Sequence, residues 1–311
     1  MNYKELKAKD WEQDLSQQQA QKTLAQRLEN WPQKSVALLK DLPVRGYRVL
    51  KRGHYLLNLG ILSLRNQFEL TKQFDYPKAN IYMRVTSAWE YKRLRPYHKE
   101  PWTVEWLENV LKAGDVFYDI GANVGGYSLI AAKMTGGQVK VFAFEPSFAT
   151  FTTLCKNIVL NNCQTSITPF QIALSSQTGL ASFNYSSLMS GAASHSLGEA
   201  EEGVSPVYQQ AVISYSLDDF IDQFKLPVPN HIKLDVDGPE LAVLHGAKQT
   251  LSNPQVRSLM LELNEDEQHS DEVVVTLLES HGFYLQKRHL RYDSRGKRRS
   301  YSFCLFGRNE L

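Results

Sequence analysis

The feature that most constrains the fold is residues 116–133, which read VFYDIGANVGGYSLIAAK. The apolar run 116–120 is too short for a buried helix and predicts a buried strand. Gly121 and Gly125 allow a tight turn after it and let a ligand approach the backbone, and a helical pattern opens at Tyr127. The first N–H groups of such a helix are unpaired and can bind a ligand. The stretch therefore predicts a strand, a glycine turn and a helix that together form a nucleotide-type cofactor site.

On either side of this stretch, short apolar runs alternate with longer amphipathic ones. Further strands are predicted at 139–144, 167–173, 231–236 and 258–263. Helices are predicted at 101–111, 148–160, 240–251 and 271–281. Strands separated by helices of about 10–15 residues imply βαβ units and a parallel sheet. Residues 283–288 and 301–306 predict a closing antiparallel hairpin, so the expected fold is α/β and Rossmann-like.

Residues 179–216 interrupt this alternation. Strands are predicted at 181–185 and 207–214, with a segment rich in Gly, Ser and Ala between them. An insertion of this kind at the functional edge of a sheet predicts a substrate lid.

Residues 1–98 are predicted to be a helical extension in front of a domain that spans 99–311. The pattern at 3–31 is helical and polar with one apolar face, and Pro32 ends it. It indicates a helix docked on the body, a contact in a homo-oligomer, or a loosely held arm. From Lys34 to Arg95 there are 13 basic and 4 acidic residues. Residues 34–75 therefore predict either a cap over the active site or a surface for anionic lipid, glycan phosphate or another acidic partner.

The chain as a whole carries little net charge. Its 35 Lys and Arg residues and 33 Asp and Glu residues leave +2, with His neutral. The basic stretches 34–95 and 287–299 contain no recognition motif or base-stacking motif. We therefore expect no nucleic-acid partner.

The three cysteines and the lengths of the apolar runs indicate in which cellular compartment the protein is found. Cys155, Cys163 and Cys304 have neither disulfide nor metal-ligand spacing, which indicates a reduced, cytoplasmic protein. The first residues are charged and show no signal peptide. The run 55–62 is shorter than the ~18 residues that span a bilayer. We expect a soluble protein, at most peripherally attached to a membrane.

Two acidic residues decide the class of cofactor. Glu145 follows the strand 139–144, where doubly wound sheets place an acid that binds the two ribose hydroxyls of a nucleoside. Asp119 precedes the first glycine of the turn, and its charge would repel the pyrophosphate of a dinucleotide. The same charge suits the ammonium of S-adenosylmethionine. The electrostatics therefore favour a methyltransferase over a dehydrogenase.

Further acids follow the strand at 231–236, in the sequence HIKLDVDGPE. Asp235 and Asp237 both lie where open α/β sheets bind ligands. The alternative for Asp237 is a turn and helix cap formed with Gly238. Glu262 and Asn264 end the next strand and would share its face. With Asp235 they could bind Mg²⁺ or position a substrate hydroxyl, or form salt bridges to nearby basic residues.

Two histidines are candidate general bases. His195 lies on the predicted lid and His269 follows Asn264, so either could reach the site. The alternative is that both are ordinary surface or helix residues.

From these motifs the chain resembles the FkbM family of S-adenosylmethionine-dependent methyltransferases. The resemblance covers about 99–306 and rests on motifs in order along the chain. These are KEPWTVEWL, GDVFYDIGANVG, FAFEPS, IALS, SLDDFI, HIKLDVDGPE and VLHGA. It implies a class I methyltransferase domain with a mostly parallel seven-stranded sheet and an antiparallel last strand. It also implies methyl transfer to hydroxyls of sugars, glycans or secondary metabolites.

The resemblance assigns roles by position. It places the methionine part of the cofactor against Asp119, Gly121, Asn123 and Gly125. The ribose would lie at Glu145, the adenosine along Ser147 and the adenine between Ala173 and Leu174. Asp235 would face the transferred methyl group.

The expected reaction is an in-line transfer from the sulfonium to an acceptor oxygen, so the protein aligns and desolvates the reactants. Asp235 is the first candidate for the base, with His195 or His269 behind it. The same site could instead serve transfer to nitrogen or to a carboxylate, or belong to a non-catalytic cofactor-binding scaffold.

Overall fold

The protein was analysed as a computed structural model that describes residues 53, 55–58, 70–198, 205–236, 238, 240–264, 270–292 and 298–308. The chain divides into two compact units, Met1–Glu69 and Leu70–Leu311. In the first unit the described residues 53 and 55–58 are helical, and the rest of this part of the predicted extension lies outside the described residues. The boundary predicted after residue 98 lies inside the second unit.

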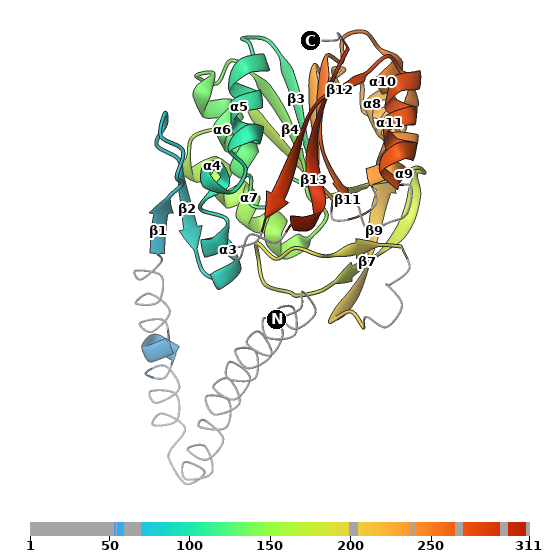
Figure 1. Cartoon of the computed structure of the whole chain (residues 1–311). Coiled ribbons are helices and arrows are strands. Elements are labelled where there is room, and N and C mark those ends of the chain that lie inside the picture. Colours follow the sequence, from blue (N-terminus) through green and yellow to red (C-terminus); the bar gives the residue numbers. More distant parts are fainter. Residues whose placement is uncertain are drawn as a thin grey trace. The chain divides into compact units, whose positions relative to one another are not determined.

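The second unit is built on a seven-stranded sheet (Figure 1). Its strands in spatial order are β12 (Tyr284–Tyr292), β13 (Arg298–Gly307), β11 (Ser258–Asn264), β10 (His231–Leu234), β3 (Val116–Ile120), β4 (Lys140–Phe144) and β5 (Ile167–Phe170). The five strands from β11 to β5 are parallel, and β13 is antiparallel to both of its neighbours. The predicted sheet and its reversed last strand are therefore confirmed.

Helices cover both faces of this sheet, which is why its central strands are mostly apolar. On one face lie α5 (Pro101–Val110), α6 (Gly126–Met134) and α7 (Phe148–Leu160). On the other face lie α8 (Leu217–Phe224), α9 (Glu240–His245), α10 (Lys248–Ser252) and α11 (Ser270–Ser280). Alternate residues of β3 enter the two cores: Phe117 packs on the α5–α7 side and Tyr118 on the other. Among the described residues, no helix is long and apolar enough to cross a bilayer.

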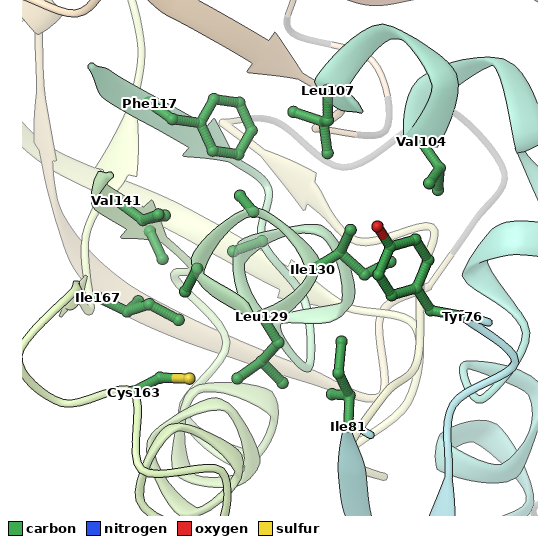
Figure 2. Packing of buried hydrophobic residues seen from close by; sticks show 14 of the residues in the cluster. Tyr76, Ile81, Val104, Leu107, Phe117, Leu129, Ile130, Val141, Cys163 and Ile167 are labelled. Atoms are coloured by element: carbon green, nitrogen blue, oxygen red, sulfur yellow. The ribbon is translucent and has the colours of Figure 1, made fainter. Parts of the chain in front are cut away.

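Residues 70–98 complete the core on the α5–α7 side. They form the antiparallel pair β1 (Leu70–Gln73) and β2 (Tyr82–Val85), followed by the short helices α3 (Ala88–Lys92) and α4 (Pro96–Lys99). Figure 2 shows Tyr76 and Ile81 beside Ile130 and Leu129 of α6, and all four side chains are buried. This segment therefore belongs to the domain rather than to a helical extension.

Two predicted elements are each divided in the structure. The strand expected at 167–173 becomes β5 and the separate β6 (Ala173–Leu174), which pairs in a second sheet. The helix expected at 240–251 breaks into α9 and α10 at Gly246. A Cβ at Gly246 would overlap the backbone carbonyl oxygen of Ser175, so the chain passes too close to that loop for any other residue.

The insertion forms this second sheet, in the order β6, β9 (Tyr208–Tyr215), β7 (Gly179–Tyr185) and β8 (Ser196–Leu197). Strands β7 and β9 are antiparallel, and they confirm the strands predicted at 181–185 and 207–214. Phe183, Tyr185 and Val212 bury a small apolar core between the strands.

Candidate functional site

The glycine turn after β3 brings the ends of β3 and β10 together. Gly121 has a φ of +79°, and a Cβ there would overlap the backbone carbonyl oxygen of Asp235. Gly125 has a φ of +89° and caps α6, with the Leu154 side chain packed where a Cβ would lie. Asn123 between them has a φ of 50°. The turn therefore depends on glycine at two positions, as the sequence predicts.

The Glu145 carboxylate is fixed directly after β4. It accepts hydrogen bonds from the backbone N–H groups of Asn123 and Ser147, each at 2.9 Å. The side chain is only 6% exposed. This arrangement holds an acid beside the glycine turn, where the resemblance places the ribose hydroxyls.

Asp119, the last acid of β3, is completely buried and only half satisfied. Its Oδ2 accepts a 2.6 Å hydrogen bond from Ser128 Oγ. Its Oδ1 has no hydrogen-bond partner among the described residues. Burial raises the pKa of Asp119 more than Lys233 and Ser128 lower it. A buried carboxylate oxygen without a donor is costly, so the site fits a ligand that brings donors, such as an ammonium group.

A buried ion pair lies beside Asp119 at the end of β10. Lys233 is paired in register with Asp119 and is 1% exposed. Its Nζ lies 2.8 Å from Asp235 Oδ2 and 4.9 Å from the centroid of the Tyr127 ring. Burial lowers the pKa of Lys233, but the charges of Asp235 and Asp119 outweigh it and raise that pKa. Lys233 in turn overcomes the effect of burial on Asp235 and holds the pKa of Asp235 well below its usual range.

Lys233 is not among the predicted site residues, although the sequence contains a signal for it. A lysine stands within the apolar strand HIKL, two residues before Asp235 and therefore on the same face. A charge in such a strand requires a buried partner. Tyr127, whose ring contacts Lys233, donates a 2.5 Å hydrogen bond from its hydroxyl to the buried Glu100.

Glu100 extends this network towards the C-terminal hairpin. Its Oε1 lies 2.7 Å from Lys99 Nζ and 3.4 Å from Arg291 Nη1. The Arg291 guanidinium is 5.5 Å from the Tyr301 ring centroid and 5.9 Å from that of Trp102. Cationic and aromatic side chains therefore border the same edge of the sheet as Asp235.

A small apolar pocket opens between the two sheets. The large sheet and its loops contribute Ile120, Gly121, Phe144, Pro146 and Val236. The chain from β5 onwards contributes Ile172, Ala173, Leu174, Phe183, His195 and Leu197. Ala173 and Leu174, which the resemblance assigns to the adenine, thus line the same pocket as Gly121.

The other predicted site residues are distributed differently. Glu262 on β11 hydrogen-bonds Asp235, and for Asn264 only the backbone is described. Asp237 and His269 lie outside the described residues. Within the described ranges no group of three or more His, Cys, Asp or Glu side chains could hold a metal ion. At Asp235 the positive charge is supplied by Lys233, as the salt-bridge alternative expects.

The insertion is attached to the domain through residues 190–192. Asn123 Nδ2 donates to the Ala192 carbonyl oxygen at 3.0 Å, directly from the glycine turn. Arg93 Nε donates to the Gly191 carbonyl oxygen at 2.9 Å, and Ser190 Oγ donates to Thr153 Oγ1 at 2.6 Å. These hydrogen bonds join the insertion to the glycine turn, whereas its role as a lid stays a prediction.

Comparison with known proteins gives matches over this region. The methyltransferase FkbM domain matches residues 119–285. The hexuronic acid methyltransferase AglP of Haloferax volcanii is 30% identical over 169 residues, and the match spans 54% of this chain and 65% of AglP, just under two thirds. The 31-O-demethyl-FK506 methyltransferase FkbM of Streptomyces tacrolimicus is 29% identical over 197 residues, covering 56% of this chain and 74% of that protein. Among solved structures, precorrin-6y C5,15-methyltransferase from Geobacter metallireducens is 15% identical with a TM-score of 0.40, covering 68% of this chain and 86% of that one.

Proposed function

The chain belongs to the FkbM family of methyltransferases, and from that premise we propose that it transfers the methyl group of S-adenosylmethionine to a hydroxyl oxygen of a sugar, glycan or secondary metabolite. The observation that carries the proposal is the unpaired Oδ1 of the buried Asp119, beside a turn that requires glycine. A buried acid at this place suits the ammonium of an amino-acid nucleoside and would repel a phosphate.

Different residues of the site would bind different parts of the cofactor. Asp119 and the glycine turn would hold the methionine part, and Glu145 would bind the ribose hydroxyls. The apolar pocket that contains Ala173 and Leu174 would take the adenine. When bound, the sulfonium supplies a methyl group that needs no further activation.

The task left to the chain is to place the acceptor and to take its proton. Lys233 keeps Asp235 ionised, and the Asp235 side chain is 23% exposed, so a carboxylate oxygen is accessible. An acceptor hydroxyl can donate its hydrogen bond to this carboxylate, which fixes the direction of the oxygen lone pairs. As the new C–O bond forms, the hydroxyl proton passes to Asp235.

The choice of oxygen as the acceptor atom is supported by one relative. The name of the Streptomyces protein specifies a 31-O-demethyl substrate, and that of AglP specifies a hexuronic acid. The acceptor proposed here is a small molecule or glycan of that kind.

The test uses the full chain, labelled S-adenosylmethionine and a panel of sugars, uronic acids and hydroxylated polyketides. We expect S-adenosylhomocysteine to bind in calorimetry and a methyl ether to form on one class of acceptor. Asp235→Asn should lower turnover by about 10²–10⁴-fold, the usual contribution of a general base, with unchanged affinity for S-adenosylhomocysteine. Asp222→Asn, at an exposed pair with Lys225, is the matched control and should retain full turnover.

Each part of the proposal can fail separately. Absence of S-adenosylhomocysteine binding would refute the cofactor assignment. A base-labile methyl ester or an N-methyl product would refute the hydroxyl acceptor. Full turnover by Asp235→Asn would remove Asp235 from the proton transfer.

A further inference from the structure

The insertion places one polar side chain inside the apolar pocket. His195 precedes β8 and lines the pocket with Ala173 and Leu174. Its imidazole packs against the rings of Phe183 and Tyr185, at centroid distances of 5.5 and 5.2 Å. The residue is only 8% exposed. Its Nε2 is buried and has no hydrogen-bond partner among the described residues.

The contacts on the other ring nitrogen determine which nitrogen carries the proton. The backbone N–H of Ser186 points at His195 Nδ1 at 3.2 Å and can only donate. The Ser186 hydroxyl, also 3.2 Å from Nδ1, donates its own proton to the Ala193 carbonyl oxygen at 2.7 Å. Nδ1 is therefore an acceptor, and the neutral ring carries its hydrogen on Nε2. Burial and the charge of Arg93 lower the pKa of His195 to about 4, so the ring is neutral at pH 7.

This tautomer does not suit the role of general base that the sequence suggested. A base needs a free lone pair at the site, but Nε2 already carries a hydrogen and Nδ1 faces Ser186. His195, a residue of the pocket wall, therefore carries a buried donor that has no acceptor among the described residues. Such a group destabilises the empty pocket, and a ligand acceptor would satisfy it.

We propose that His195 Nε2–H donates a hydrogen bond to a ring nitrogen of the cofactor's adenine, so that the insertion recognises the nucleobase. The inference rests on the proposed function, because it assumes that S-adenosylmethionine occupies this site. Asp119 and Glu145 account for the amine and the ribose of the cofactor, which leaves the adenine without an assigned polar partner. The pocket walls Phe144, Pro146 and Leu174 offer apolar surface for a flat ring. Adenine has three ring nitrogens that accept hydrogen bonds, whereas its exocyclic amine donates.

The inference is tested by calorimetry on the full chain, with no turnover required. The ligands are S-adenosylhomocysteine and its 1-deaza, 3-deaza and 7-deaza analogues, each of which lacks one ring acceptor. We expect one analogue to bind about tenfold more weakly than the parent compound, as for a lost buried hydrogen bond. The other two should bind within about threefold of it.

Variants identify His195 as the donor. His195→Phe should weaken S-adenosylhomocysteine about tenfold and abolish the difference between it and the sensitive analogue. His195→Gln retains an N–H donor and should recover part of the affinity. His281→Phe is the matched control, because His281 contacts Ser252 outside the pocket, and its affinities should be unchanged.

Three outcomes would overturn the inference. The first is equal affinity of the unmodified protein for all four ligands, which decides the matter even if a variant fails to fold. The second is an equal loss for all four ligands in His195→Phe, which would mean that the ring only shapes the pocket. The third is unchanged binding by His195→Phe. A protein that binds none of the four ligands would instead refute the proposed function, and the inference with it.

Discussion

At the scale of single residues, the candidate site depends on one buried cation. Lys233 lies next to Asp119 in the sheet register and pairs with Asp235. A buried ammonium and a buried carboxylate each lose several kcal/mol of hydration, which their attraction must offset. Removing one partner leaves the other charged and unpaired in the interior. We infer that the lysine is retained to keep Asp235 ionised rather than to stabilise the fold.

Lys233→Met should therefore destabilise the protein by about 3–5 kcal/mol at pH 7, the usual effect of breaking a buried pair. The measurement is the free energy of unfolding from urea denaturation. Because Asn needs no counter-ion, the double variant Lys233→Met with Asp235→Asn should lose less than the two single losses added together.

The chain offers a matched control for this comparison. Lys225 forms an ion pair of the same length, 2.8 Å, with Asp222, but the two side chains are 80% and 85% exposed. Lys225→Met should cost less than about 1 kcal/mol, because water screens an exposed pair. Similar losses for the two methionine variants would contradict the assignment of Lys233 as a buried counter-ion.

At the scale of elements, the turn between β3 and α6 sets the geometry of the site. Gly121 meets two separate requirements, a positive φ and a close approach to the backbone of Asp235. Gly114 has nearly the same φ, +88°, but a Cβ there would meet nothing within 4 Å. The two positions therefore separate backbone conformation from steric contact.

Gly114→Ala should destabilise the protein by about 1–2 kcal/mol, the cost of a left-handed conformation with a Cβ. Gly121→Ala should lose at least about 3 kcal/mol more, because the carbonyl oxygen it meets belongs to the backbone and cannot rotate away. Urea denaturation midpoints give the comparison. Equal losses would show that the contact with Asp235 is not a constraint.

Local sequence patterns were sufficient to predict the elements whose own residues carry a clear periodicity or apolar run. Strand β3 and helix α7 have the predicted bounds, since an apolar run or a 3.6-residue periodicity lies within each. The broken helix at Gly246 was missed, because the cause is a contact with Ser175, 71 positions earlier in the chain. The division of β5 from β6 likewise depends on pairing with β9, which no local pattern contains.

The candidate site was likewise predictable only where its residues stand in or next to local motifs. Asp119, Gly121 and Glu145 stand in or next to short motifs, and the structure brings them together as expected. The position of His195 was not predictable, because it depends on how residues 190–192 attach to Asn123 and α3. The lysine in the apolar strand HIKL indicated a buried partner, but the proximity of Lys233 to Asp119 depends on the pairing of β10 with β3.

At the scale of the whole molecule, the described cores lie in one unit. The buried residues of the two large clusters run from Phe74 to Phe306, all within Leu70–Leu311. The residues proposed to bind the cofactor are in the same range. This unit therefore contains the described apolar surface that drives folding.

A chain that begins at Leu70 should fold cooperatively and bind S-adenosylhomocysteine within about threefold of the full chain, a difference below 1 kcal/mol. Its melting temperature should lie within about 4 °C, the shift that roughly 1 kcal/mol causes at this size. Calorimetry gives both quantities. An insoluble or non-cooperative product would show that residues 1–69 take part in the core.

The position of β13 between β11 and β12 has a consequence for how the protein is made. A ribosome releases β11 and then β12 before residues 298–307 exist, yet β13 pairs with both of them. Until that last segment emerges, the nascent sheet has an open edge, and such edges invite pairing with other chains. A stop codon after β12 would leave β11 and β12 without their shared neighbour. Translation must therefore reach residue 307 before β13 can pair fully with β11 and β12.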